Sequence, residues 1–342
     1  MASTTGRDPF RSRIPVTVLT GFLGSGKTTL LNALLKLPEA ANTAVIVNEF
    51  GDVGIDHELV RNSTEAVTLL DNGCVCCALR GDLQQTLRDL FLARRAGEID
   101  GFERVILETT GLADPAPVMQ TLITDAALAA SYRLDGVVTV IDAAQGRAQL
   151  AEFPEAMKQA AVADRIVISK ADLAGARLVD DLAQELAKIN PTAQRAVAAA
   201  GVIAADFVLG VGLDQARVPP EAVERWLGPA HEPAAAGHAH GISTFTLWFE
   251  RPFEREVFEH CVEVLTALRG SDLLRVKGLV NVAGESGPVV VQGVQHLFHP
   301  PVTLAAWPGA DRRSRLVFIT RGIARETVAG LFAAVTAIAP PV

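Results

Sequence analysis

Short runs of apolar residues alternate with helical patterns between residues 14 and 228. The runs typical of buried strands cover residues 14–19, 43–47, 66–70, 104–107, 136–141 and 165–168. Helical spacing or an alanine-rich helical composition covers residues 28–37, 82–95, 116–130 and 178–188. Strands that alternate with helices form parallel sheets covered on both faces. This part of the chain therefore predicts an α/β fold with a mostly parallel sheet.

The pattern changes near residue 229. Residues 229–240 read PAHEPAAAGHAH, a run of small residues, proline, glycine and histidine that is typical of a linker. Beyond it, residues 243–249 alternate polar and apolar positions, which indicates a half-buried strand. A helix, three further strands and a closing helix follow at 255–268, 274–282, 289–294, 315–319 and 323–338. We therefore expect a small α+β domain at this end.

These patterns predict two domains joined by a linker. We expect an N-terminal tail over residues 1–13, a first domain over 14–228, a linker over 229–241 and a second domain over 242–342. The length of 342 residues exceeds that of one average domain. With 49% hydrophobic residues, the chain can bury sizeable cores.

Charge and apolar run length exclude two classes of partner. Asp and Glu outnumber Lys and Arg by 39 to 31, a net charge of −8, whereas a nucleic-acid binder needs a basic surface. No apolar run reaches the roughly 18–20 residues that a membrane span requires. The first 13 residues are polar and lack the apolar stretch of a signal peptide. We therefore expect a cytoplasmic protein without nucleic-acid or membrane partners.

A glycine-rich segment after the first strand carries the strongest chemical signal. Gly21-Phe-Leu-Gly-Ser-Gly-Lys-Thr28 fits G-x-x-x-x-G-K-[ST] and lies between a strand and a helix, the context of a P-loop. In a P-loop the backbone N–H groups surround phosphate oxygens, Lys27 reaches the β/γ-phosphates and the Thr28 hydroxyl binds Mg²⁺. The candidate nucleotide-binding residues here are Gly21, Gly24, Ser25, Gly26, Lys27, Thr28 and Thr29.

Two further strand ends carry polar groups of matching chemistry. Glu108 begins the segment Glu-Thr-Thr-Gly, where its carboxylate can orient Mg²⁺ or a water and Gly111 can donate its N–H to a γ-phosphate. In the segment Ser169-Lys-Ala-Asp172, the Asp172 carboxylate suits guanine N1 and N2, and the Lys170 stem suits the ring. Ser169 stands where asparagine is usual, so this segment does not decide whether the nucleotide is GTP or ATP.

Three of the four cysteines lie within four positions. Cys74, Cys76 and Cys77 follow a turn at residues 71–73, and soft thiolates suit Zn²⁺, Cu⁺ or Co²⁺. Three thiols this close do not all bind one ion easily, so a further ligand is expected, and Glu49 after the second strand is the candidate. Thiols that are merely buried or redox-active are the alternative. Cys261, alone in a later helix, fits a small buried hydrophobe.

The parallel sheet predicts that the chemistry-bearing segments meet. The P-loop, Glu49, the cysteine cluster and Glu108 are all expected at carboxyl ends of strands, the edge where such sheets bind ligands. Linker residues His231, His238 and His240 suit a transient metal contact about as well as a solvated linker.

With these residues assembled, the chain resembles the CobW-like family of P-loop GTPases, a branch of the metallochaperone GTPases. The matching segments are VTVLTGFLGSGKTTLLN, VNEFGDVGID, GCVCC, ILETTGLADPAP and ISKAD, with LLRVKGLVNV and RSRLVFITR in the second domain. The resemblance implies a P-loop NTPase fold with an added α+β domain. It also implies a transition-metal site at Glu49, Cys74, Cys76 and Cys77, with Cys76, Cys77 and Glu49 as its core.

The function implied is a GTPase that delivers a metal. GTP and Mg²⁺ are the expected cofactors, with Lys27, Glu108 and a water-positioning Asp52 as catalytic residues and Thr28 and Glu108 as Mg²⁺ ligands. The γ-phosphate orders residues 49–56 and 108–114, so that hydrolysis changes the Zn²⁺ or Co²⁺ site. The expected partner is a client metalloprotein or a cobalamin-type pathway enzyme; self-association is left open. A P-loop kinase with a structural thiol cluster and a nucleotide-switched scaffold are the alternatives.

Overall fold

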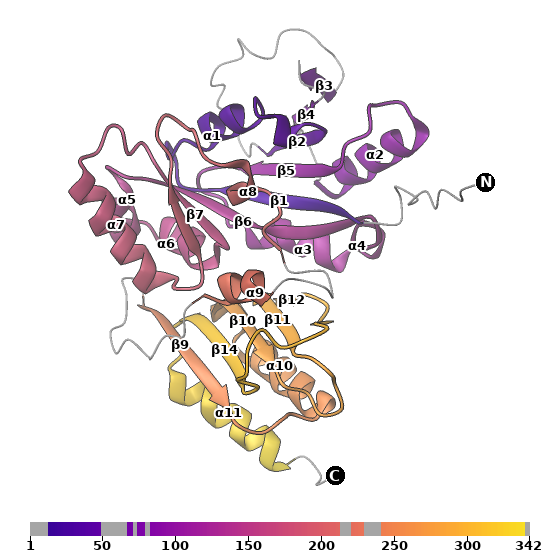
Figure 1. Cartoon of the computed structure of the whole chain (residues 1–342), viewed down its shortest axis with the longest axis vertical. Helices are drawn as coiled ribbons and strands as arrows, with labels where there is room; N and C mark the ends of the chain where they lie inside the picture. Colours follow the sequence, from indigo (N-terminus) through magenta and orange to yellow (C-terminus); the bar gives the residue numbers. More distant parts are fainter. Residues whose placement is uncertain are drawn as a thin grey trace.

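The computed structural model describes residues 13–48, 67–70, 74–78, 83–212, 220–228 and 241–338, and for 48, 67–70, 74–78, 220 and 225 the backbone alone. Two domains lie end to end along the long axis of the molecule (Figure 1). The first domain contains the larger, mostly parallel sheet, and the second domain contains an antiparallel sheet. None of the described helices combines the length and apolar character needed to cross a membrane.

Within the described residues, eight strands form the first sheet in the order β3-β4-β2-β5-β1-β6-β7-β8. All neighbours pair in parallel except β3, which pairs antiparallel with β4 at one edge. The strands are β1 (Ile14–Thr20), β2 (Thr43–Asn48), β3 (Val67–Leu70), β4 (Cys74–Ala78), β5 (Arg104–Thr109), β6 (Tyr132–Asp142), β7 (Arg165–Ser169) and β8 (Gln194–Val197). The expected α/β fold with a mostly parallel sheet is confirmed.

Helices cover both faces of this sheet because its central strands carry apolar residues on both sides. On one face a core forms against helices α2 (Leu83–Ala96), α3 (Ala116–Thr124), α4 (Ala126–Ser131), α5 (Gly146–Glu152), α6 (Pro154–Val162) and α7 (Ala176–Ile189). On the other face a second core forms against α1 (Lys27–Leu34), the 3₁₀ turn η1 (Pro38–Ala40) and α8 (Ala205–Val208). The burial that fixes the P-loop strand β1 therefore comes from both layers.

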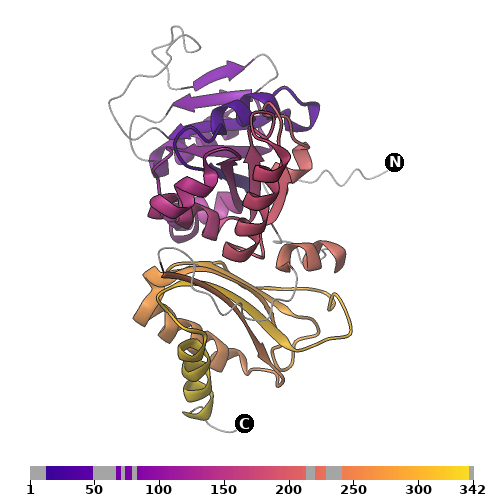
Figure 2. The same ribbon diagram turned by 90° about the vertical axis from the view of Figure 1, so that its left-hand side faces the viewer.

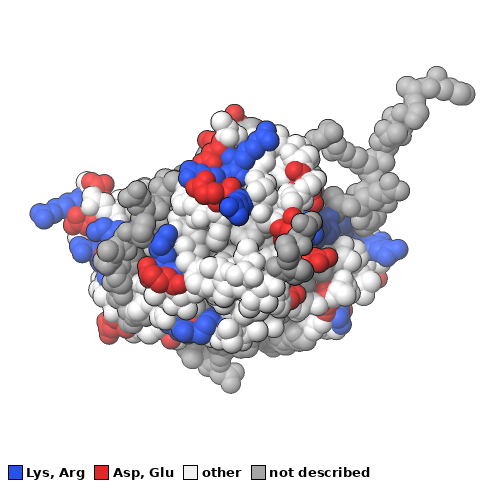
Figure 3. Space-filling view, turned by 90° about the horizontal axis from the view of Figure 1, so that it is seen from below, with Lys and Arg blue, Asp and Glu red and all other residues white. Residues whose placement is uncertain are grey.

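The second domain packs two helices on one face of its sheet (Figure 2). Its strand order is β12-β11-β10-β14-β9, with β13 paired to β11. The elements are β9 (Ile242–Phe249), α10 (Arg255–Arg269), η3 (Gly270–Asp272), β10 (Leu273–Val280), β11 (Val289–Val294), β12 (Leu297–Phe298), β13 (Val302–Thr303), β14 (Ser314–Arg321) and α11 (Arg325–Ile338). Seen from its own end, this domain shows basic and acidic side chains interspersed around a wide uncharged area (Figure 3).

The two domains share a continuous apolar contact. Ile242, Leu274 and Ile319 of the second sheet belong to the buried cluster that the first sheet forms with helices α2 to α7. Helix α9 (Pro220–Leu227), in the stretch expected to belong to the first domain, packs Trp226 against Leu279 of the second sheet. Such a buried apolar interface fixes the domains relative to each other more firmly than a polar one.

A buried ion cluster crosses the same interface. Asp164, between α6 and β7, accepts hydrogen bonds from the Arg275 guanidinium and the Lys277 ammonium of β10, the latter at 2.7 Å. All three side chains are at most 5% exposed. The Lys277 ammonium also lies 5.2 Å from the centre of the Trp226 ring. Burial opposes ionisation of Asp164, but Arg275 and Lys277 outweigh it and hold the pKa of that carboxyl well below its ordinary value.

The expected single helix over residues 116–130 is wrong. The structure divides it into α3 and α4 at Asp125, which has an extended backbone conformation and is the N-cap of α4. Its carboxylate accepts from the N–H groups of Ala127 and Leu128, both at 2.9 Å. An aspartate inside an apolar helical pattern thus starts a new helix because its side chain satisfies the exposed backbone donors.

Candidate nucleotide site

The P-loop turns at glycines that adopt left-handed backbone conformations. Gly24 and Gly26 have φ values of 71° and 94°, which side chains with a Cβ rarely adopt, and Gly26 is the residue that caps α1. Gly21 has no room for a side chain, because a Cβ there would lie 2.3 Å from the Val140 carbonyl oxygen of β6. The sequence therefore curls the chain tightly between β1 and the N-terminus of α1, where backbone N–H groups can receive phosphate oxygens.

Lys27 lies inside this curl. Its ammonium donates to the carbonyl oxygens of Gly21, at 2.9 Å, and Phe22, at 3.3 Å, and the residue is only 9% exposed. Burial lowers the pKa of Lys27, and the nearby carboxylate of Glu108 partly offsets this. A desolvated cation whose hydrogen-bond partners among the described residues are neutral carbonyl oxygens has a strong electrostatic attraction for phosphate oxygens.

Thr28 and Glu108 meet beside the lysine. The Thr28 hydroxyl donates to Glu108 Oε1 at 2.7 Å, although the two residues lie on α1 and at the end of β5. Register explains the contact, because Glu108 pairs with Leu19 of β1, just before the P-loop. A hydroxyl and a carboxylate side by side are the oxygen ligands that Mg²⁺ takes, with water and phosphate oxygens as the rest. The two predicted Mg²⁺ ligands thus lie together.

The loop after β5 presses against the P-loop at Gly111. A Cβ on Gly111 would lie 2.6 Å from the backbone nitrogen of Leu23 and 2.7 Å from its Cα. Only glycine lets the two backbones approach this closely. The sequence prediction that Gly111 belongs to the phosphate end of the site is consistent with this contact.

Helix α6 holds the same loop from behind. The side-chain amide of Gln159 donates to the carbonyl oxygens of Gly111, at 3.2 Å, and Ala113, at 3.0 Å, and Gln159 is 1% exposed. Its neighbour Lys158 forms an ion pair with Asp114 of the loop. Sequence reasoning missed both residues, because α6 lies in an alanine-rich stretch without a motif and its partners are remote in sequence.

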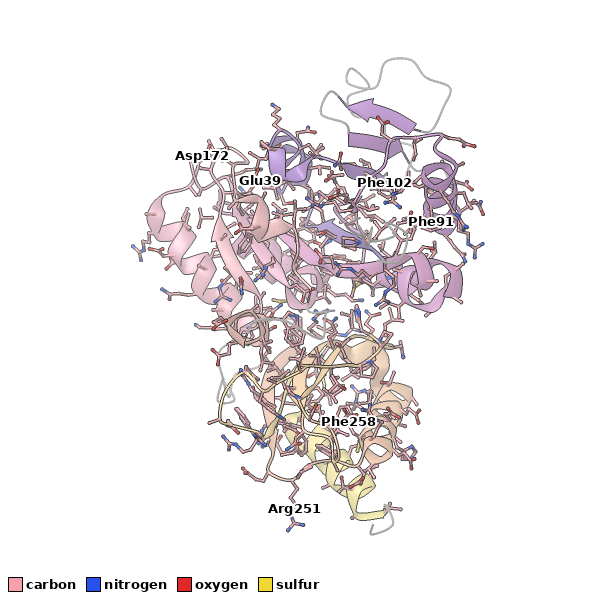
Figure 4. All side chains as sticks on the ribbon, turned by 45° about the vertical axis from the view of Figure 1, so that its right-hand side comes forward. Glu39, Phe91, Phe102, Asp172, Arg251 and Phe258 are labelled. Carbon is pink, nitrogen blue, oxygen red and sulfur yellow. The ribbon has the colours of Figure 1, made fainter. Side chains whose placement is uncertain are left out.

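The residues predicted to recognise the base, Lys170 and Asp172, follow β7 and lie near the loop after β8. The Lys170 ammonium lies 2.8 Å from an Asp142 carboxylate oxygen at the end of β6, and Lys170 has a left-handed φ of 54°. Asp172 accepts from the N–H of Ala200, at 3.1 Å, in the loop after β8. Figure 4 places Asp172 on the first domain at the end away from the second domain. The sequence did not reveal that Asp142 and the Ala200 loop orient these two predicted base-facing residues.

The cysteine cluster lies differently from the expectation. Residues 74–78 form β4 itself, which pairs in parallel with β2, whereas the sequence predicted that the cysteines follow the turn at 71–73 and lie beyond the carboxyl end of a strand. The cause is pairing, because β3 folds back antiparallel on β4 and completes a strand pair at the sheet edge. Within that strand, Cys76 and Cys77 lie opposite Val45 and Ile46 of β2.

Several predicted residues lie outside the described part of the chain. These are Glu49, Asp52 and the linker histidines, and the side chains of the three clustered cysteines are likewise not described. Among the side chains that the structure does describe, no three His, Cys, Asp or Glu gather as a metal site. Cys261 is buried, as predicted for a small hydrophobe, and burial raises the pKa of its thiol to about 11.

We expect Gly111→Ala to lower nucleotide hydrolysis by about tenfold or more, because a misplacement of about 1 Å at a catalytic loop can cost that much. The added Cβ must displace either the Leu23 backbone or the loop after β5. Steady-state phosphate release measures the effect. Gly175→Ala is the matched control, since it has an ordinary φ of −72° and open space around its Cβ. Equal losses in both variants would contradict the steric argument.

The parallel sheet, the curled glycine loop with its buried lysine and the adjoining Thr28–Glu108 pair define a P-loop nucleotide-binding protein. Residues 15–197 match the nucleotide-binding domain of the CobW/HypB/UreG family, and residues 242–336 match the cobalamin synthesis protein cobW C-terminal domain. The chain therefore belongs to the CobW/HypB/UreG family, and the resemblance seen in its motifs is confirmed.

Relatives with established descriptions share both domains. The zinc chaperone YjiA of Escherichia coli strain K12 is 33% identical over 327 residues, 94% of this chain and 98% of its own length. The zinc chaperone CobW of Pseudomonas aeruginosa strain PAO1 is 29% identical over 350 residues, 93% of this chain and 90% of its own. The crystal structure of Zn(II)-bound YjiA GTPase from E. coli superposes with a TM-score of 0.75 and 31% identity, over 95% of this chain and 99% of that one.

Proposed function

We propose that this chain is a GTPase that hydrolyses GTP to GDP and phosphate and uses the two nucleotide states to transfer a divalent transition metal ion, zinc or cobalt, to a client protein. The observation that carries the proposal is the position of the cysteine strand in the nucleotide-binding sheet. β4 is separated from β5 by β2 alone, and the cross-strand row of Cys77, Ile46 and Leu107 directly precedes the row that contains Glu108.

The nucleotide half of the proposal assigns a task to each group of the predicted nucleotide site. The P-loop N–H groups and Lys27 bind the phosphates, Thr28 and Glu108 hold Mg²⁺, and Gly111 senses the γ-phosphate. Bound Mg²⁺ supplies neutralisation of the developing phosphate charge. Asp172 accepts from guanine N1 and N2 while the Lys170 stem covers the ring. Asp52 is our proposal for the residue that positions the attacking water.

The metal half assigns the transported ion to soft ligands. Cys76, Cys77 and Glu49 form the proposed core set, with Cys74 beside them, because thiolates select zinc and related ions. Relatives that match over more than nine-tenths of this chain are described as zinc chaperones, and one was crystallised with zinc. Zinc is therefore our first assignment for the transported ion, and cobalt is the second.

The second domain is the proposed contact with the client, and α6 links it to the nucleotide loop. In its middle, Lys158 and Gln159 hold residues 111–114, and directly after its end Asp164 binds Arg275 and Lys277 of the second sheet. Gln295 of that domain also reaches Asp114, at 3.4 Å. A shift of residues 111–114 on hydrolysis could therefore be transmitted to the second domain through the buried contacts of Gln159 and Asp164. This proposal retains the division into domains over 14–228 and 242–342.

The test is a metal titration of the full chain in two nucleotide states. We expect zinc or cobalt affinity to differ about 5- to 150-fold between protein loaded with GDP and protein loaded with a non-hydrolysable GTP analogue, the range usual for coupled sites. The doubly substituted variant, Cys76→Ala with Cys77→Ala, should lose high-affinity metal binding. Cys261→Ala is the matched control, because that thiol is buried in the second domain and remote from the proposed set.

The outcomes separate the parts of the proposal. Equal metal affinities in the two nucleotide states would contradict coupling, and an unchanged metal content in the double cysteine variant would remove the thiols from the site. A kinase would instead consume nucleotide only with a phosphoryl acceptor present, so phosphate release by the purified protein with Mg²⁺ alone distinguishes the two enzyme classes.

A further inference from the structure

Ser169 stands where a base-reading loop of this kind usually has asparagine, and the structure shows how its hydroxyl is used. The residue is 5% exposed, at the end of β7, and its Oγ lies 2.5 Å from the carbonyl oxygen of Ser25 in the P-loop. The Ile141 carbonyl oxygen of β6 lies 3.3 Å from the same Oγ. The single hydroxyl proton is therefore directed at protein carbonyl oxygens, chiefly that of the P-loop.

The backbone of Ser169 and the start of α1 complete its surroundings. Gly26, at the N-terminus of α1, lies next to the hydroxyl, since even an added Cβ there would be at van der Waals distance, 3.8 Å, from Ser169 Oγ. The backbone carbonyl oxygen of Ser169 accepts from the N–H of Ala143 at 2.9 Å. The side chain and the backbone of one residue thus join the end of β7 to the P-loop and to the end of β6.

The base-facing groups lie on the following residues. Lys170 and Asp172 are oriented by Asp142 and by the Ala200 N–H, respectively. The next residue of that loop, Gly201, lies close to α1, because a Cβ there would be 3.1 Å from the Thr29 carbonyl oxygen. Ser169 therefore joins the end of β7 directly to the P-loop, and the loop after β8, which orients Asp172, lies against α1 at Thr29.

We propose that Ser169 is a positioning residue that ties the base-recognition loop to the P-loop and takes no part in choosing the base. It sets the affinity for the triphosphate, whereas Asp172 sets the preference for guanine. The inference rests on the proposed nucleotide function. It also accounts for serine at the position where asparagine is usual, since the Ser169 hydroxyl already reaches the Ser25 carbonyl oxygen, at 2.5 Å.

The deciding experiment compares a ligand that has no base with ligands that have one. Inorganic triphosphate, GTP and ATP are titrated calorimetrically, each with Mg²⁺, into the full-length wild-type protein and the variants Ser169→Ala, Ser169→Thr and Asp172→Ala. We expect Ser169→Ala to weaken all three ligands by the same factor, about three- to tenfold for one lost buried hydrogen bond. Ser169→Thr, which keeps the hydroxyl, should stay close to wild type.

Asp172→Ala serves as the opposite control. It should leave the affinity for inorganic triphosphate unchanged and remove the preference for GTP over ATP. Thermal unfolding of each variant confirms that the compared proteins are folded. The proposal is overturned if Ser169→Ala binds inorganic triphosphate as wild type does, or if it changes the ratio of GTP to ATP affinity. If wild type itself shows no preference for GTP, the guanine assignment fails, while the inorganic triphosphate arm still decides the role of Ser169.

Discussion

Replacement of Asp164 by alanine should destabilise the protein by about 3–5 kcal/mol, the usual cost when one partner of a buried ion pair is removed. The side chains of Arg275 and Lys277 are 2% and 1% exposed, so the variant leaves two buried cations without their carboxylate. The Val137 N–H loses its acceptor at 2.9 Å as well. Urea unfolding followed by circular dichroism measures the loss, which should also appear as looser association of the two domains in limited proteolysis.

The matched control is an exposed ion pair of the second domain. Asp311 contacts Arg313 at 2.8 Å, but its side chain is half exposed, and exposed pairs contribute little. Asp311→Ala should therefore leave the unfolding midpoint nearly unchanged. If Asp164→Ala unfolds at the same urea concentration as the control, the buried cluster does not hold the domains together.

The low pKa of Asp164 gives this prediction a pH dependence. Because the folded state keeps the carboxyl ionised at a pH where the unfolded chain binds a proton, its contribution is complete above about pH 4 and is lost as the pH falls below that value. The difference in unfolding free energy between wild type and Asp164→Asn should therefore narrow in acid. A difference that stays constant down to pH 3 would contradict the assigned shift.

The elements that could be predicted from the sequence are those whose hydrophobic pattern lies within one continuous segment of the chain. The P-loop and the central strands were predicted within a few residues, because β1, β2, β5 and β7 are continuous apolar runs that end at polar motifs. The resemblance also identified the second domain, which has a helix-strand pattern with few motifs of its own.

What the sequence did not reveal depends on contacts between distant segments. Asp125 interrupts a long apolar helical pattern, and only its capping bonds show that the helix restarts there. Gln159 and Asp164 lie in a stretch without a motif, and their partners are 46–48 and 111–113 positions away. Strand β4 was not predicted, since five residues with three cysteines carry no strand periodicity and their pairing with β2 is a tertiary property.

Replacement of Lys27 by alanine should lower GTP hydrolysis at least about a hundredfold, the usual cost of removing one preorganised donor from a buried charge-stabilising site. Its ammonium is held by the Gly21 and Phe22 carbonyl oxygens in a curl that is closed to water on most sides. When nucleotide binds, charged phosphate oxygens would replace the neutral carbonyl oxygens as acceptors for the Lys27 ammonium. The electrostatic stabilisation that results increases as negative charge develops in the transition state. The variant should hydrolyse GTP much more slowly while its thermal unfolding temperature stays close to that of wild type.

A variant that removes the same charge nearby isolates this electrostatic role. Lys36 follows α1 with an exposed side chain, so Lys36→Ala changes the net charge equally without touching the P-loop. Single-turnover hydrolysis with saturating GTP and Mg²⁺ separates the chemical step from binding, and thermal unfolding monitors the fold. Lys27→Ala should reduce the single-turnover rate while Lys36→Ala retains it, because the Lys27 ammonium lies inside the P-loop and Lys36 lies beyond the end of α1. Comparable rates in the two variants would place the phosphate-binding charge elsewhere and would contradict the site as built.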